Sequence, residues 1–223
     1  MSDWFYAASK LFCRFVKRQC LHEVILHGER AKRTGGYLLA CTHVSHVEPF
    51  LMTGLIERPI VWMARIEFYR LPVLGSILRL LRSISVHRQG VPVRAIRDAI
   101  DVARGGGIVG IFPEGGCRKG KDLAFRGGRI KRGACVIATR AQVPILPVVI
   151  LGTDKLTAID PWLPAMQGKI WIAFGRPIDP PPIPSRADRR RGRETLARNL
   201  EAEFTLTYQD LLSHAGLNDA MTP

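Results

Sequence analysis

The sequence lacks a long apolar run that could cross a bilayer, because basic residues interrupt its hydrophobic amino-terminal segment every few positions. It also lacks a cleavable signal-peptide pattern. Its five cysteines are an odd number without paired spacing, which argues against a disulfide framework and favours a reducing compartment. We therefore expect exposure to the cytoplasm.

Acidic side chains are scarce, since 19 aspartates and glutamates stand against 33 lysines and arginines in 223 residues, and the formal net charge is +14. This excess predicts an anionic partner, which can be nucleic acid, an anionic membrane surface or a phosphorylated substrate. The aromatic residues are scattered and do not alternate with basic ones as they do in proteins that stack nucleic-acid bases. We therefore expect an anionic membrane surface as a partner and no nucleic acid, for which charge is the only argument.

The first 22 residues predict a basic amphipathic helix. Its apolar members recur at helical spacing: Trp4, Phe5, Ala8, Leu11, Phe12, Phe15 and Val16. The basic residues between them are Lys10, Arg14, Lys17 and Arg18. A helix of this kind lies in the interface of a membrane, so we expect a peripheral protein on the cytoplasmic face. The alternative is that the apolar stripe packs against the helix's own domain, as in many globular proteins.

Short apolar runs alternate with helical patterns through most of the chain, which predicts an α/β fold: a single domain with a largely parallel central sheet flanked by helices. We expect this domain over residues 23–178. The expected strands are Val24–Leu26, Tyr37–Cys41, Ile60–Met63, Ile84–Val86, Ile108–Phe112, Ile145–Leu151 and Ile170–Phe174. The expected helices are Pro49–Ile56, Phe68–Arg82, Val93–Arg104 and Arg129–Ala141.

The remaining segment, 179–223, starts with the proline-rich linker Asp179–Pro184. It continues into an amphipathic helix from about Glu194 to Ser213, which we expect to pack on the domain. Between them lies a basic cluster of Arg186, Arg189, Arg190, Arg191 and Arg193. The cluster is most simply a solvated face, and contact with anionic lipid head groups is the alternative.

A histidine and a carboxylate stand five positions apart where the strand Tyr37–Cys41 gives way to a helix: they are His43 and Glu48. Along a continuous helix their side chains would diverge by about 140°, so they can meet only if His43 precedes the first helical turn. A histidine held by a carboxylate can deprotonate an alcohol. Glu48 can also complete a capping box with Ser45, and both roles can coexist.

Metal ligation is a further alternative for this segment, because His43, His46 and Glu48 are all possible ligands. The order of these residues is not that of a zinc protease, and the sequence has no supporting cluster of cysteine and histidine elsewhere. We therefore favour the base and expect no metal.

A second chemically dense segment follows the expected strand Ile108–Phe112. It holds an acid, two glycines and three cations: Glu114, Gly115, Gly116, Arg118, Lys119 and Lys121. Glycines leave backbone N–H groups reachable, and cations bind phosphate. Arg88 stands at the end of another expected strand. Strand ends gather at one edge of an α/β sheet, where ligands usually bind.

Four ordered blocks over residues 37–151 make the chain resemble the glycerolipid acyltransferase family, typified by lysophosphatidate acyltransferase. The family's Asn/Thr-His-x-Ser-x-x-Asp block corresponds to Thr42–Glu48, and its strand ending in Asp-Arg corresponds to Val86–Arg88. The block Phe-Pro-Glu-Gly-Thr-Arg-Ser corresponds to Phe112–Gly115 and then diverges, and Val-Pro-Ile-x-Pro-Val corresponds to Val143–Val148. The chain departs from this pattern in having Glu48 for the aspartate and Gly116-Cys117 for Thr-Arg, with Arg118 one place late.

The resemblance implies an enzyme of phospholipid biosynthesis, an acyltransferase that moves a fatty acyl group from acyl-CoA or acyl carrier protein to a lysophospholipid hydroxyl. The acceptor it favours is 1-acylglycerol-3-phosphate, and another single-chain lipid is the alternative. It implies His43 as base and Glu48 as its orienting acid. The implied substrate-binding residues are Arg88, Glu114, Gly115, Gly116, Arg118 and Lys119. No metal or organic cofactor is implied.

Two other interpretations remain open. In one, Cys117 is a covalent nucleophile, although no base lies near it in the sequence. In the other, the exchange at Glu48 and the altered block around Cys117 mark a non-catalytic relative that binds anionic lipid.

Overall fold

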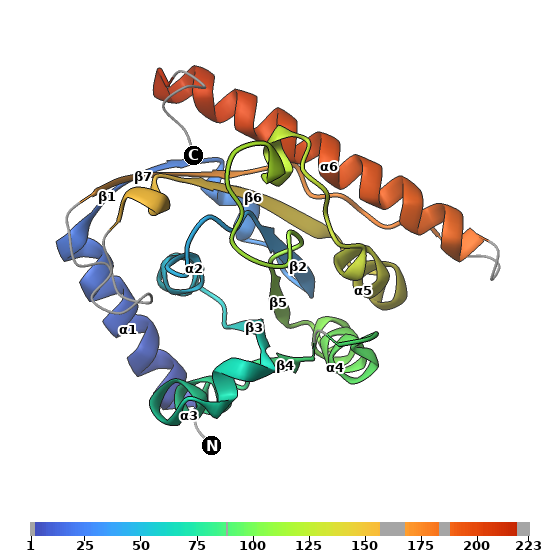
Figure 1. The fold of residues 1–223 in the computed structure, drawn as a ribbon, viewed down its shortest axis with the longest axis horizontal. Coiled ribbons are helices and arrows are strands. Elements are labelled where there is room, and N and C mark those ends of the chain that lie inside the picture. Colours follow the sequence, from blue (N-terminus) through green and yellow to red (C-terminus); the bar gives the residue numbers. More distant parts are fainter. Residues whose placement is uncertain (1–2, 88, 157–167, 183–187, 218–223) are drawn as a thin grey trace.

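The computed structural model describes residues 3–87, 89–156, 168–182 and 188–217. Its described part confirms the α/β fold: a seven-stranded sheet with helices on both faces (Figure 1). The strands are β1 (Leu21–Leu26), β2 (Tyr37–Cys41), β3 (Ile60–Arg65), β4 (Ile84–Val86), β5 (Ile108–Ile111), β6 (Ile145–Leu151) and β7 (Gly168–Phe174). The α-helices are α1 (Asp3–Cys20), α2 (Glu48–Leu55), α3 (Pro72–Leu80), α4 (Val93–Arg104), α5 (Gly133–Ala141) and α6 (Asp188–Ala215).

The strands lie in the order β1-β7-β6-β2-β5-β3-β4. All neighbouring pairs are parallel except β6 and β7, so the sheet is largely parallel as expected. The chain leaves β2 toward β3 on one side and later places β6 on the other side of β2. The carboxyl end of β2 is therefore a topological switch point, where α/β sheets bind ligands.

Alternation along β2 builds two hydrophobic cores, one on each face of the sheet. Leu38 and Ala40 face a core completed by α4, α5 and α6, which cover this face in Figure 1. Tyr37, Leu39 and Cys41 face the other core, to which α2 contributes. Each of these five side chains is fully buried, which is the pattern of a central parallel strand covered on both sides.

Helix α1 packs against α2 through one side and exposes the other. Cys13 is buried and lies against Gly54, where a side chain would crowd it, and Arg14 donates a hydrogen bond of 3.1 Å to the Gly54 carbonyl. The exposed side carries four large apolar side chains that are each more than half exposed: Trp4, Leu11, Phe12 and Phe15. The buried side confirms the alternative that the helix packs on its own domain, and membrane binding through the exposed side stays a prediction. Within the described residues, no helix is long and apolar enough to span a bilayer.

Three helices differ in extent from their predictions. The expected helix Phe68–Arg82 divides into a short 3₁₀ turn, Ile66–Arg70, and α3. The reason is Pro72, because the residue before a proline is pushed out of the helical region and Leu71 has an extended ψ of 126°. Helix α5 begins four residues late. Helix α6 begins at Asp188, so the described arginines of the basic cluster are helical, and Arg186 lies outside the described residues.

Candidate active site

His43 lies in the loop between β2 and α2, before the first helical turn. Its Nδ1 atom is 2.9 Å from Oε2 of Glu48, the first residue of α2. An ionised carboxylate only accepts hydrogen bonds, so the ring donates through Nδ1–H, and when the ring is neutral its Nε2 carries the lone pair. This is the tautomer that a general base needs.

The Glu48 carboxylate is fully buried and is held by four donors. Besides His43, its Oε1 accepts hydrogen bonds from the backbone N–H of Ser45 at 2.8 Å and of Val44 at 3.2 Å. The Thr153 hydroxyl, directly after β6, donates to the same oxygen at 2.6 Å. Glu48 therefore serves both the N–H groups before the helix and the histidine. These bonds offset the cost of burying a charge.

The loop after β5 fixes the backbone of His43 at two points. Glu114 accepts a hydrogen bond from the His43 N–H at 2.6 Å, and the Arg118 N–H donates to the His43 carbonyl at 2.8 Å. The second oxygen of Glu114 accepts from the Ala124 N–H at 2.7 Å. Burial raises the pKa of Glu114 to about 7, although both N–H groups oppose the shift. Its position indicates a role in holding His43.

An aromatic stack fixes the ring of His43 from the side. Phe112 lies against it with ring centroids 4.1 Å apart, and Trp62 lies against Phe112 at 5.2 Å. Gly110 makes room for this stack, because a Cβ there would lie 2.4 Å from the Trp62 ring. The sequence therefore needs a glycine inside β5.

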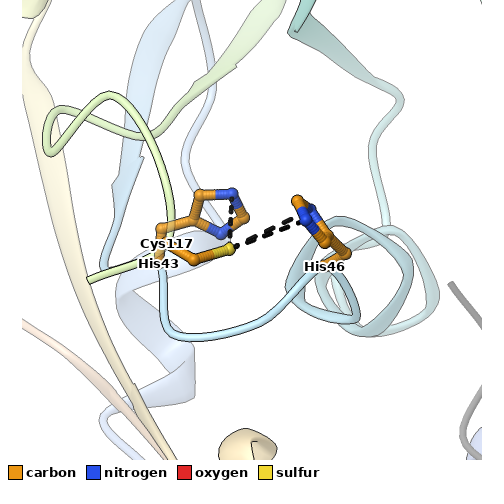
Figure 2. Close-up of side chains that lie close together, drawn as sticks. All are labelled: His43, His46 and Cys117. Carbon is orange, nitrogen blue, oxygen red and sulfur yellow. Dashed lines mark hydrogen bonds between the residues drawn. The ribbon is translucent and has the colours of Figure 1, made fainter. Parts of the chain in front are cut away.

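Cys117 lies beside the free nitrogen of His43 (Figure 2). Its Sγ is 3.6 Å from His43 Nε2 and 3.9 Å from both ring nitrogens of His46. Burial opposes ionisation of the thiol, but hydrogen bonds with the two histidines outweigh it and lower the pKa of Cys117 to about 6. The base that Cys117 lacks nearby in the sequence is thus supplied by two histidines that the fold brings beside it.

The same contacts change the protonation of His43. Burial alone would lower its pKa, but hydrogen bonds and attraction from Cys117 and Glu48 outweigh burial and raise the pKa of His43 to about 9. At neutral pH the histidine and the thiol therefore favour an imidazolium–thiolate pair, as in paired Cys–His sites.

Among the expected phosphate ligands, Arg118 and Lys119 are exposed on the loop after β5. Arg88 lies outside the described residues. A further cation, Lys131, escaped the sequence analysis: its side chain covers Gly115, where an added Cβ would lie 2.5 Å from Cε. The chain returns there because the Lys131 N–H donates to the carbonyl of Pro113 at 2.7 Å. No local motif predicts this contact.

The chain matches the family described as Acyltransferase over residues 23–151, more than half of its length. This segment contains His43, Glu48 and the loop after β5. The chain belongs to the acyltransferase family.

Several curated relatives of the chain are named 1-acyl-sn-glycerol-3-phosphate acyltransferase. The chain is 27% identical over 155 residues to the 1-acyl-sn-glycerol-3-phosphate acyltransferase of Bacillus subtilis, and the matched segment covers 69% of this chain and 72% of that protein. It is 26% identical over 134 residues to the protein of the same name from Borreliella burgdorferi, with coverage of 59% and 52%. The chain thus matches only about half the length of the second relative.

A solved acyltransferase has a similar fold. The crystal structure of the 1-acyl-sn-glycerophosphate (LPA) acyltransferase PlsC from Thermotoga maritima superposes with a TM-score of 0.63 at 23% identity, covering 88% of this chain and 78% of that one.

In the present chain, Thr153 is a further residue of the site that the sequence did not predict. The sequence could have indicated this role, because Thr153 follows a strand at the same edge of the sheet as His43.

Proposed function

We propose that this acyltransferase moves a fatty acyl group from a thioester donor to the hydroxyl of 1-acylglycerol-3-phosphate, with His43 as general base. The observation that carries the proposal is the hydrogen bond between His43 Nδ1 and the buried Glu48 carboxylate, which leaves Nε2 to accept a proton. The acceptor is inferred from two relatives, which are both named 1-acyl-sn-glycerol-3-phosphate acyltransferase.

In the proposed reaction, Nε2 of His43 removes the hydroxyl proton as the acceptor oxygen attacks the thioester carbonyl. The new C–O ester bond forms, the C–S bond breaks, and the donor leaves as a thiolate. The imidazolium of His43 then returns the proton to that thiolate, which becomes the free thiol of CoA or acyl carrier protein. Glu48 holds the ring in its tautomer and stabilises the imidazolium. No cofactor takes part.

We propose that the acceptor phosphate binds to Arg118 and Lys119 on the loop after β5, joined by Lys131, whose side chain covers Gly115 on that loop. Arg88 lies outside the described residues and stays a candidate from the sequence alone. Gly116 is the better of the two glycines as an oxyanion donor, since the Gly115 N–H already donates to Phe112 at 2.9 Å.

We also propose that the enzyme binds peripherally to the cytoplasmic face of an anionic membrane through α1. Trp4, Leu11 and Phe15 recur at intervals of seven and four residues and are 71%, 69% and 61% exposed, so they form one apolar stripe. A lipid acceptor would be delivered from such a surface.

The test is acyl transfer by purified protein supplied with acyl-CoA or acyl carrier protein thioester and a panel of lysophospholipids, with the acylated lipid measured by mass spectrometry. Wild type should form phosphatidate from 1-acylglycerol-3-phosphate, and His43→Ala should form none while unfolding at the same temperature. The matched control is His22→Ala, an exposed histidine on β1. Full activity of His43→Ala would overturn the mechanism.

One observation favours a second candidate function, a lipid-binding protein without acyl transfer. The pKa of His43 is raised to about 9, against the effect of burial, by the hydrogen bonds with Cys117 and Glu48, and a protonated histidine cannot act as a base at neutral pH. Binding to anionic liposomes without product from any acceptor between pH 6 and pH 10 would support this candidate.

A further inference from the structure

Three side chains at the mouth of the site converge through atoms that ligate metals. These atoms are a ring nitrogen of His43, a ring nitrogen of His46 and the sulfur of Cys117, and all lie within 4.8 Å of one another. Figure 2 shows the sulfur between the two rings, with the histidines from one loop and the cysteine from another. Glu48 was a candidate third ligand in the sequence. Its two carboxylate oxygens instead accept hydrogen bonds from His43 Nδ1, Val44, Ser45 and Thr153.

The distances fit a tetrahedral zinc ion. Zn–S bonds of about 2.3 Å and Zn–N bonds of about 2.0–2.1 Å set sulfur and nitrogen about 3.6 Å apart at the tetrahedral angle. In the structure, Cys117 Sγ is 3.6 Å from His43 Nε2 and 3.9 Å from the His46 ring nitrogens. An ion placed among the three atoms therefore needs shifts of a few tenths of an ångström at the sulfur, and it needs the two histidine nitrogens, which lie within 4.8 Å of each other, to come to about 3.3 Å apart.

The surroundings of His43 are also those of a zinc ligand. A ligating histidine almost always donates its other ring N–H to a carboxylate or carbonyl, which fixes the ring and raises its basicity. Glu48 accepts that bond at 2.9 Å, and Phe112 stacks on the same ring. His43 is therefore oriented in advance, with Nε2 turned toward Cys117 and the metal position.

We propose that His43, His46 and Cys117 bind one Zn²⁺ ion and that the bound ion blocks acyl transfer. A thiolate and two imidazoles are the ligands that zinc favours, and three protein ligands leave its fourth position open. The ion takes the lone pair of Nε2, the atom that removes the acceptor proton in the proposed reaction. On binding, the proton shared by the Cys117–His43 pair passes to solvent.

The binding test uses full-length protein freed of metal with a chelator and then titrated with Zn²⁺ against a chromophoric chelator. Wild type should take up one ion per chain, and Cys117→Ser and His46→Ala should each lower the affinity about tenfold or more. The control is His22→Ala, which should bind as wild type does. Equal zinc affinity in all four proteins would overturn the site.

Cobalt gives a readout that does not depend on activity. Co²⁺ bound to wild type should show a thiolate-to-cobalt charge-transfer band, which Cys117→Ser should lack. Thermal unfolding in the presence of chelator checks that each variant is folded. Because Cys117 is exposed, its replacement should leave the fold intact. Binding of Mg²⁺ as tight as that of Zn²⁺ would also contradict the inference, because Mg²⁺ prefers oxygen ligands.

The inhibitory half of the inference rests on the proposed function, whereas zinc binding does not. Zn²⁺ should suppress phosphatidate formation by wild type, and chelator should restore it. Zinc uptake without acyl transfer under any condition would leave the metal site standing and remove the proposed function. Acyl transfer without zinc uptake would support the proposed function and overturn the metal site.

Discussion

Glu114 accepts a hydrogen bond of 2.6 Å from the backbone N–H of His43, a residue 71 positions away. The acid of the third motif block thus holds the histidine of the first in place. Because its other oxygen accepts from Ala124, the carboxylate links two loops at the carboxyl edge of the sheet.

Glu114→Gln tests this link. An amide has one acceptor oxygen, so one of the two N–H groups would face an NH₂ group and lose its partner. We expect a loss of about 1–3 kcal/mol in the free energy of unfolding, measured by denaturant titration, and a lower kcat. Glu67→Gln, an exposed control in the 3₁₀ turn Ile66–Arg70, should change neither. Unchanged stability of Glu114→Gln would contradict the linking role.

Glu48→Gln and Glu48→Asp separate the two functions of Glu48. The glutamine oxygen can keep the three donors of Oε1, but the NH₂ group that replaces Oε2 cannot accept the proton of His43 Nδ1, so the ring loses its tautomer. We expect kcat to fall about 10²–10⁴-fold. Aspartate keeps the carboxylate one methylene shorter and should lose less. The kcat values of both variants test this order, and their unfolding temperatures are the control. An equal loss of kcat in the two variants would mean that Glu48 acts by packing alone.

Removal of the Cys117 thiol should change the pH dependence of acyl transfer. Burial lowers the pKa of His43, but hydrogen bonds with Cys117 and Glu48 raise it to about 9, and the base must be neutral. Wild-type activity should therefore rise with pH up to about 9. In Cys117→Ala, one of the two groups that raise this pKa is gone, so the rise should occur at lower pH and the rate at pH 7 should increase.

The pH profiles should be recorded in chelator, so that no metal competes for His43. Loss of all activity in Cys117→Ala across this range would instead indicate that the cysteine carries the acyl group. In that case, mass spectrometry of wild type with donor alone should detect an acylated Cys117.

The pairing of His43 with Glu48 could be predicted because both residues lie in one seven-residue segment at a strand-to-helix junction. The strand β2 could also be predicted, because its short apolar run is typical of a strand buried on both faces. Cys117 could not be placed beside His43, because the two residues are 74 positions apart with three strands between them, and the loop after β5 turns back only through tertiary hydrogen bonds. The break at Pro72 was available in the sequence, since proline restricts the residue before it.

The exposed stripe of α1 predicts how membrane binding can be removed. Leu11→Ser and Phe15→Ser replace side chains that are more than half exposed, so the fold should tolerate them. Burial of such a side chain in lipid contributes about 1.5–3 kcal/mol, so each change should weaken binding to anionic liposomes about tenfold or more. Leu206→Ser on α6, 57% exposed, is the control and should bind normally. Equal effects of all three would contradict binding through α1.

The aromatic stack on His43 depends on the absence of a side chain at Gly110. In Gly110→Ala, the new Cβ would lie 2.4 Å from the Trp62 ring, so the ring must move and the stack through Phe112 onto His43 must shift. We expect the free energy of unfolding to fall by about 1–3 kcal/mol, and kcat, measured at the same temperature as for wild type, to fall as well. Gly133→Ala, at the start of α5 with nothing within 4 Å of its Cβ, should instead be neutral or stabilising by about 0.4–1 kcal/mol. If both alanines behaved alike, the stack would not be what orients the base.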